Sequence, residues 1–196
     1  MKIVFATHNP NKLKEIQNVL PQYEVVGLDE LNLTEDIPEP FETLEENAMA
    51  KASYIFKNHG LACFSDDSGL EVESLNGEPG VHSAHYAGPQ RSDEDNMNLL
   101  LGNLEKHGNN VSRQAQFRTV VAYMAPGVSK TFEGIAPGQI TQEKRGEQGF
   151  GYDPIFIPEG ETRTFAQMSL EEKGQISHRK RAIAKFIQWL ESDQKS

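Results

Sequence analysis

The sequence has one cysteine, no excess of basic residues and no long apolar run. Because Cys63 has no second cysteine to pair with, a disulfide within the chain is excluded, and we expect a reducing compartment, the cytoplasm. The 29 acidic residues against 19 basic ones give a net charge of −10, which excludes a nonspecific binder of nucleic acid polymers. No stretch approaches the roughly 18 apolar residues of a membrane span, and residues 3–6 are too short for the core of a signal peptide.

The pattern of apolar residues predicts one α/β domain over residues 1–196. Hydrophobic residues make up 37% and charged residues 24%, which is typical of a globular protein. Short apolar runs predict strands at residues 3–6, 25–26, 61–65, 115–125 and 129–140, and helical spacing predicts helices over 13–20, 44–56, 99–104 and 176–190. Since strands and helices alternate before the long strands begin, we expect a mixed twisted sheet with flanking helices, in two lobes around a central ligand-binding cleft.

The turn between the first predicted strand and helix has the composition of an anion site. It reads Thr7, His8, Asn9, Pro10, Asn11 and Lys12. Asn9 is a suitable N-cap, with Pro10 at the first helical position. The unpaired N–H groups and the dipole of a helix start favour a phosphate, and Lys12 adds a positive charge. An ordinary capped turn with a solvated lysine explains the same residues equally well.

Acidic residues at two places suggest a metal site. Asp66 and Asp67 follow a predicted strand, which we expect to end in a polar turn at residues 65–69. Paired carboxylates suit Mg²⁺, and one of them can also activate a water. Glu39 is either a second ligand or part of a solvated loop, because it belongs to a group of six acids: Glu35, Asp36, Glu39, Glu42, Glu45 and Glu46.

Two of these acids have a structural explanation. Thr43 with Glu46 forms a capping-box pattern, as Ser169 with Glu172 does later in the chain. Glu45 and Glu46 would then lie in a first helical turn, where they complement the helix dipole.

An aromatic motif lies near the end of the predicted sheet. Gly149 and Gly151 flank Phe150, and Tyr152 and Asp153 follow. Glycines let the backbone approach a ligand closely, and a free ring can stack on a base. A turn whose aromatic rings enter the core is the alternative.

The basic residues near the last predicted helix depart from the usual charge preference of a helix start. Residues 173–185 contain five basic residues and no acid, namely Lys173, Arg179, Lys180, Arg181 and Lys185. His178 and Arg179 stand at the start of the predicted last helix, where positive charge opposes the helix dipole. Such a departure points to function, and both side chains can bond to a purine edge. A solvated basic face explains the last three bases of this segment better.

In combination, these motifs resemble the inosine/xanthosine triphosphate pyrophosphatases, a family of enzymes acting on non-canonical purine nucleoside triphosphates. The similarity covers nearly the whole chain and keeps the order of the family's motifs. It includes residues 6–12, 45–48, 65–70, 79–86, 149–154 and 177–179. The resemblance implies two α/β lobes around a nucleotide-binding cleft, a homodimer, and a hydrolase that needs Mg²⁺. It would convert ITP, dITP and XTP to the monophosphate and pyrophosphate and so cleanse the nucleotide pool.

The resemblance also implies a role for each motif residue. Asp67 corresponds to the catalytic base and a metal ligand, and Glu39 to the second metal ligand. The remaining matched residues would contact the substrate: Thr7, His8, Asn9, Pro10, Asn11, Lys12, Ser68, Phe150, Gly151, Tyr152, Asp153, Lys173, His178 and Arg179.

Three other functions stay open from the sequence. They are a pyrophosphatase for another modified nucleotide, a nucleotide-binding module that does not hydrolyse, and a phosphatase that releases orthophosphate. The net charge of −10 does not exclude a nucleotide, because the acids of residues 34–47 are separate from the bases of residues 173–185. We expect one of those acids to hold the metal that accompanies the triphosphate.

Overall fold

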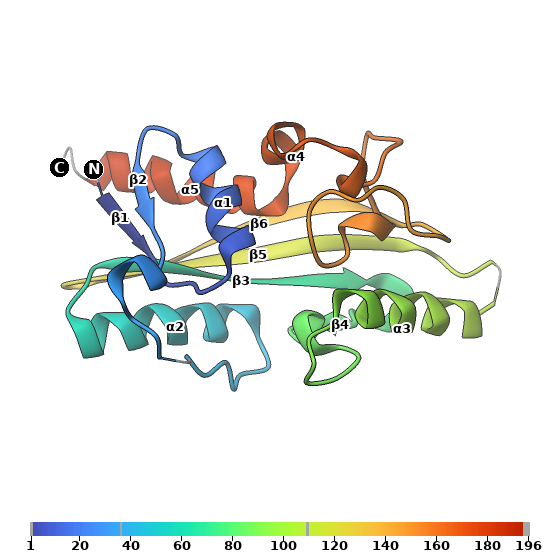
Figure 1. Cartoon of the computed structure of the whole chain (residues 1–196), viewed down its shortest axis with the longest axis horizontal. Coiled ribbons are helices and arrows are strands. Elements are labelled where there is room, and N and C mark those ends of the chain that lie inside the picture. Colours follow the sequence, from blue (N-terminus) through green and yellow to red (C-terminus); the bar gives the residue numbers. More distant parts are fainter. Residues whose placement is uncertain (1, 36, 109, 194–196) are drawn as a thin grey trace. The chain divides into compact units, whose positions relative to one another are not determined.

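The computed structural model describes residues 2–35, 37–108 and 110–193, so Asp36 of the acidic group lies outside them. The helices are α1 (Pro10–Val19), α2 (Leu44–His59), α3 (Asp93–Lys106), α4 (Leu170–Ile176) and α5 (His178–Asp193), labelled in Figure 1. The strands are β1 (Lys2–Phe5), β2 (Glu24–Val26), β3 (Cys63–Val72), β4 (Pro79–Gly80), β5 (Gln114–Ala125), β6 (Val128–Ile140) and β7 (Phe156–Pro158). No helix among the described residues has the length and apolar character needed to cross a membrane.

The strands form a mixed sheet in the order β2-β1-β3-β5-β6-β7, and β4 pairs with β3. β1 is parallel to both β2 and β3, with Lys2 opposite Glu24 and Val4 opposite Cys63. The β3–β4 and β6–β7 pairs are antiparallel. The predicted fold class, a mixed α/β sheet with flanking helices, is therefore confirmed.

The described residues divide into two compact units. Unit 1 contains the residues up to Asp67, Thr119–Gly134 and the residues from His178 onward, and unit 2 contains Ser68–Arg118 and Ile135–Ser177. Each unit has its own apolar core.

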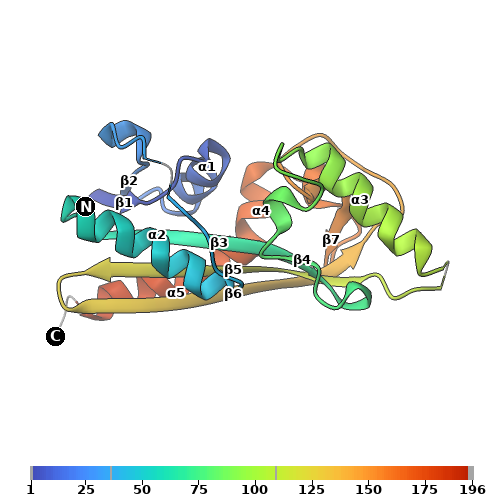
Figure 2. The ribbon, with the colours of Figure 1, turned by 90° about the horizontal axis from the view of Figure 1, so that it is seen from below.

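The core of unit 1 combines aliphatic side chains with a set of contacting aromatic rings. The rings of Phe5 and Phe64 lie 4.6 Å apart and nearly parallel, and Phe186 from α5 is 5.3 Å from Phe64. Figures 1 and 2 show α2 on one face of the sheet in this unit and α5 on the other face. α5 approaches β6 closely at Gly134, where a Cβ atom would lie 2.1 Å from the carbonyl oxygen of His178. Glycine at this position therefore lets the first turn of α5 rest on the sheet.

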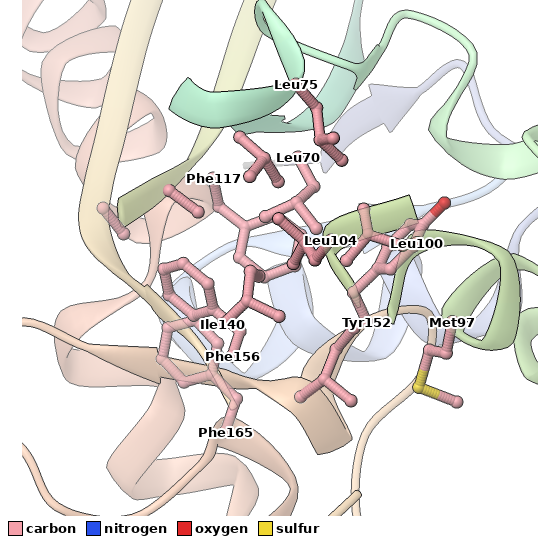
Figure 3. Packing of buried hydrophobic residues seen from close by; sticks show 14 of the residues in the cluster. Leu70, Leu75, Met97, Leu100, Leu104, Phe117, Ile140, Tyr152, Phe156 and Phe165 are labelled. Atoms are coloured by element: carbon pink, nitrogen blue, oxygen red, sulfur yellow. The ribbon is translucent and has the colours of Figure 1, made fainter. Parts of the chain in front are cut away.

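The core of unit 2 contains the ring of Phe117, and Figure 3 shows the packing of its buried side chains. This ring meets Phe156 edge-on at 4.7 Å, and Leu100 and Leu104 of α3 are fully buried in the same cluster. Tyr152 belongs to this core and is only 4% exposed. The unit thus has a rigid apolar base under the aromatic motif of residues 149–154.

The structure confirms three predicted helix caps, but α3 begins at Asp93, six residues before the predicted residue 99. Asn9 caps α1 with Pro10 in its first turn, Thr43 caps α2, and Ser169 forms a reciprocal capping box with Glu172 at α4. α5 begins at His178 as expected. Ile176, which its spacing assigned to the last helix, instead ends α4.

The predicted end of the strand at residues 61–65 is also wrong. The polar run of residues 65–69 is not a turn, because β3 continues through it to Val72. Residues 63–67 are all buried although two of them are aspartates. The partners that make this burial possible are distant in sequence, as the candidate site shows.

Candidate active site

The turn before α1 is held by its own cap. Oδ1 of Asn9 accepts hydrogen bonds from the backbone N–H groups of Asn11 at 2.9 Å and Lys12 at 3.2 Å. The N–H of Leu13 donates to the backbone oxygen of Asn9, and Pro10 has no N–H. The unpaired N–H groups that the sequence suggested for phosphate are therefore already engaged. What this turn offers an anion is the helix dipole and the charge of Lys12.

The side chains of Thr7 and His8 are also engaged within the chain. Oγ1 of Thr7 accepts a hydrogen bond from the N–H of Asn9 at 3.1 Å. Nδ1 of His8 lies 2.6 Å from Oδ1 of Asp29, and its Nε2 lies 2.9 Å from the backbone oxygen of Glu35. The imidazole thus ties the turn to the segment that leads toward Glu39. The substrate contact expected of His8 stays a prediction.

Asp66 is the centre of a buried charge network in unit 1. Its Oδ1 accepts from Nζ of Lys12 at 2.9 Å, and its Oδ2 accepts from Nε of Arg179 at 3.0 Å. Nη1 of Arg179 also contacts the carboxylate of Glu15. Burial alone would raise the pKa of Asp66, but Lys12 and Arg179 outweigh it and hold this pKa well below its usual range. Asp66 is therefore a fixed anion that positions two cationic side chains.

A second cluster surrounds Lys51 on α2. Its ammonium contacts the carboxylate of Glu39 and lies 3.6 Å from Oδ1 of Asp67. Burial would lower the pKa of Lys51, but the negative charges of Asp67 and Glu39 raise it above the usual value. The two predicted metal ligands thus lie on either side of one positive charge.

Hydrogen bonds between β3 and α2 build this cluster. Oγ of Ser65 donates to the backbone oxygen of Ala48, and Sγ of Cys63 donates to the backbone oxygen of Ala52 at 3.4 Å. The two donors are two residues apart on β3, so they lie on the same face of the strand. The two acceptors are four residues apart on α2, so they lie on the same face of the helix. The strand is therefore fixed against the helix beside the carboxylates. Cys63 is a free, buried cysteine.

Asp67 differs from its neighbour Asp66 in the direction of its pKa shift. Burial raises the pKa of Asp67, Glu39 and Asp66 raise it further, and Lys51 and Lys12 oppose the rise. A carboxyl group with a raised pKa is a better proton acceptor near neutral pH than an ordinary one. Of the two adjacent acids, Asp67 has the properties of a base, and Asp66 has those of an anchor.

The carboxylates of Asp67 and Glu39 also fit a hard cation. Among the described residues, no group of three or more His, Cys, Asp or Glu side chains is arranged to hold a metal. Two carboxylates are nevertheless a suitable donor set for Mg²⁺, which completes its octahedron with water and substrate phosphate. A single ammonium already lies against both side chains, so their negative charge is directed at one cation position.

Unit 2 holds the aromatic motif beside a buried ion pair. Nζ of Lys173 donates to Oδ2 of Asp153 at 2.6 Å and lies 4.9 Å from the ring centre of Phe150. The same oxygen accepts from the N–H of Phe150 at 3.0 Å. A Cβ atom at Gly149, whose φ is +78°, would lie 2.0 Å from that oxygen. Glycine is therefore required for Asp153 to fix the backbone of Phe150.

The other predicted residues of unit 2 are Ser68, Gly151 and Tyr152. Tyr152 is buried, and its hydroxyl donates to the backbone oxygen of Ser83 at 2.8 Å. Its ring therefore packs in the core and is not exposed for stacking on a base. The N–H of Gly151 donates to Asp93 at 2.7 Å. Ser68 is half-buried on β3, directly after Asp67.

His178 and Arg179 belong to unit 1, in the first turn of α5, and are buried. The guanidinium of Arg179 bonds to two carboxylates, which removes the cost of placing positive charge at a helix start. The predicted contact of these two side chains with a purine stays a prediction.

Sequence reasoning missed Lys51 and Glu15. A signal for Lys51 was present, since it lies on the helix face formed by Ala48, Ala52 and Ile55, where a lysine breaks the apolar pattern. Glu15 gave no comparable signal, because it lies among other polar residues of α1 and its partner is 164 residues away.

Comparison with known proteins identifies the family. The profile of the Ham1 family matches residues 3–189. A dITP/XTP pyrophosphatase of Flavobacterium johnsoniae is 50% identical over 191 residues, 97% of this chain and 98% of that protein. The dITP/XTP pyrophosphatase of Staphylococcus aureus strain MRSA252 is 45% identical over 194 residues, 98% of each chain.

Solved structures agree with the sequence comparison. The structure of the Staphylococcus aureus Ham1 protein matches with a TM-score of 0.87 at 44% identity, over 98% of this chain and 100% of that chain. A HAM1 protein from Coxiella burnetii matches with a TM-score of 0.87 at 36% identity, over 98% of this chain and 99% of that one. The match thus extends over both units, and the chain belongs to the Ham1 family.

Proposed function

We propose that this protein hydrolyses the non-canonical purine nucleoside triphosphates dITP, ITP and XTP to the nucleoside monophosphate and pyrophosphate. The family membership and the relatives named dITP/XTP pyrophosphatase support the enzyme class and the substrates. The observation that carries the proposal is the arrangement of Glu39 and Asp67 around one cation position, beside the buried network of Lys12 and Asp66. Removal of these nucleotides would keep them out of DNA and RNA.

We propose Mg²⁺ as the cofactor, held by Asp67 and Glu39. When bound, Mg²⁺ would neutralise charge on the triphosphate and on the departing pyrophosphate. The side chain of Lys51 would then have to share its two carboxylates with the metal, and Lys12 would add positive charge from the start of α1.

The reaction needs one water and one base. The water oxygen adds to phosphorus as the α–β phosphoanhydride bond breaks, and Asp67 accepts the proton that the water loses. Asp66 does not take part in proton transfer, because its lowered pKa keeps it ionised beside Lys12 and Arg179. Most of the rate enhancement would come from positioning and charge neutralisation, as in other phosphoryl transfers.

The nucleobase contacts would come from Phe150, His178 and Arg179. The ring of Phe150, held over Lys173 by Asp153, provides a face for stacking. His178 and Arg179 would bond to the 6-oxo edge shared by hypoxanthine and xanthine. Guanine has the same 6-oxo group, so rejection of GTP must depend on position 2 of the base.

Three further expectations belong to the same proposal. We propose that residues 1–196 function as a single domain, that the protein is a homodimer, and that it is cytoplasmic. Light scattering of the purified protein tests the dimer, and cell fractionation tests the compartment.

A substrate panel tests the proposed function. ITP, dITP, XTP, GTP, ATP and a modified pyrimidine triphosphate are each incubated with the protein and Mg²⁺, and pyrophosphate and orthophosphate are measured separately. We expect pyrophosphate from the first three, at least about tenfold faster than from GTP or ATP, equivalent to about 1.4 kcal/mol or more in the barrier. Preference for the pyrimidine, release of orthophosphate, or binding without any product would each replace this proposal with one of the alternatives.

A further inference from the structure

Asn47 on α2 holds the backbone of Phe41 with two hydrogen bonds. Its Oδ1 accepts from the N–H of Phe41 at 2.9 Å, and its Nδ2 donates to the backbone oxygen of Phe41 at 2.9 Å. The Asn47 side chain is buried, with 3% of its surface exposed. One amide thus satisfies both backbone groups of a single residue six positions earlier.

Side-chain packing contributes little to the conformation of residues 38–43, the segment that contains Phe41. Residues 38–43 are all exposed, and Phe41 itself is 44% exposed. An exposed segment gains little from burial, so its conformation depends on its hydrogen bonds and on local backbone restrictions. The amide of Asn47 is therefore a main constraint on this part of the chain.

The same segment carries Glu39, two residues before Phe41. Glu39 lies between Pro38 and Pro40, and proline restricts both its own φ angle and the residue before it. Because the backbone between Glu39 and Phe41 is stiff, fixing Phe41 also fixes the direction of the Glu39 side chain.

Asn47 and Lys51 act from one face of α2. They are four residues apart, so their side chains point the same way. Asn47 bonds to the backbone of Phe41, and Lys51 contacts the carboxylate of Glu39 in the same segment. The second carboxylate at this position, Asp67, comes from a strand that is itself bonded to the helix.

We propose that Asn47 is a positioning residue that sets the metal affinity of the site by holding Glu39 toward Asp67. This inference rests on the proposed function, in which these two carboxylates bind Mg²⁺. Residues that orient a metal ligand commonly change the affinity by about 10- to 100-fold when they are replaced.

α3 in unit 2 offers a matched control. Asn96 occupies the same position relative to its helix cap, four residues after Ser92, as Asn47 does relative to Thr43. Its Oδ1 accepts from the N–H of Ala87 at 2.7 Å, and its Nδ2 donates to the backbone oxygen of Ala84 at 3.2 Å. It is equally buried, at 2% exposure, but the segment that it holds carries neither of the proposed metal ligands.

The test compares Asn47→Ala with Asn96→Ala in the full chain. Thermal unfolding gives the stability of each, and calorimetric titration with MgCl₂, in the presence of an α,β-methylene analogue of ITP, gives the Mg²⁺ affinity without turnover. We expect similar losses of stability, because each variant removes the same kind of buried amide. We expect Mg²⁺ binding to weaken by about tenfold or more in Asn47→Ala and by less than about twofold in Asn96→Ala.

A second variant covers the case in which Asn47→Ala does not fold. Asn47→Asp keeps the acceptor for the N–H of Phe41 and loses the donor to its carbonyl, and its charge suits a helix start. An added carboxylate would by itself strengthen Mg²⁺ binding, so weaker binding in this variant can come only from lost positioning.

The outcomes are distinguishable. Equal Mg²⁺ affinity in the wild type and the Asn47 variants would overturn the role of Asn47 and leave the proposed function standing. Absence of both Mg²⁺ binding and pyrophosphate release in the wild type would overturn the proposed function, and the inference with it.

Discussion

Nε of Arg179 donates to Oδ2 of Asp66 at 3.0 Å, although 113 residues separate the two in sequence. This bond makes an aspartate acceptable inside β3, because the carboxylate is paired on one side with Arg179 and on the other with Lys12. The next residue, Asp67, lies 3.6 Å from the ammonium of Lys51, and burial raises its pKa. Two adjacent acids of the same strand therefore have different tasks, and their variants should differ accordingly.

Replacement of Asp67 should affect turnover and not stability. In Asp67→Asn the proposed base and one metal ligand are lost, so we expect the rate of pyrophosphate release from ITP to fall at least about 100-fold. The free energy of unfolding should stay within about 1 kcal/mol of the wild type, since burial already disfavours the charged form of Asp67. Activity within a few-fold of the wild type would remove Asp67 from the mechanism.

Replacement of Asp66 should reduce stability strongly. Asp66→Asn leaves the cationic groups of Lys12 and Arg179 without a buried carboxylate that both now contact. Loss of one partner from a buried ion pair costs about 3–5 kcal/mol, and we expect urea denaturation to show a decrease of this size. A variant as stable as the wild type would show that the network contributes nothing to folding.

The close approach of α5 to β6 predicts opposite effects for two glycine substitutions. In Gly134→Ala the new methyl group would meet the backbone of His178 and Ala182, so we expect a loss of about 1–3 kcal/mol in stability. Gly102 lies within α3 with nothing within 4 Å of an added Cβ atom, so Gly102→Ala should stabilise by about 0.5–1 kcal/mol. Denaturant titration of both variants measures the contrast, and equal effects would contradict the packing described for α5.

The buried thiol of Cys63 predicts a dependence of stability on alkaline pH. Burial raises the pKa of Cys63 from 9.0 to about 12. A raised pKa in the folded state favours folding fully below the unfolded pKa, and this contribution is lost as pH rises from about 9 toward 12. The wild type should therefore lose more stability than Cys63→Ala between pH 8 and pH 11, measured by urea denaturation.

Reactivity gives an independent check of the same thiol. At pH 8 the native protein should resist alkylation by iodoacetamide, because the thiolate is the reactive form. Rapid labelling without denaturant, or parallel pH profiles of the two proteins, would be inconsistent with this burial.

Local sequence signals predicted the parts of this molecule that depend on neighbouring residues. The caps at Asn9, Thr43 and Ser169 each act within four residues, so residue type and spacing were sufficient to find them. The long strands of residues 115–125 and 129–140 were equally visible, because each carries its own apolar pattern.

The predictions that were wrong or missing concern residues whose partners are distant in sequence. The run at residues 65–69 has the composition of a turn, and only the pairing of Asp66 with Lys12 and Arg179 explains why it is a buried strand. The roles of Lys51 and Asn47 likewise depend on which loop the fold brings to α2. A single sequence shows the chemical type of such residues, but it does not show which distant residues the fold brings into contact with them.

A competition experiment measures the proposed substrate preference and the products in one assay. Equal concentrations of ITP, GTP and ATP are incubated in one vessel with limiting protein and Mg²⁺, and nucleotides and phosphates are separated by ion-exchange chromatography. We expect IMP and pyrophosphate to accumulate in equal amounts while GTP and ATP remain. Equal consumption of the three nucleotides, or orthophosphate in place of pyrophosphate, would contradict it.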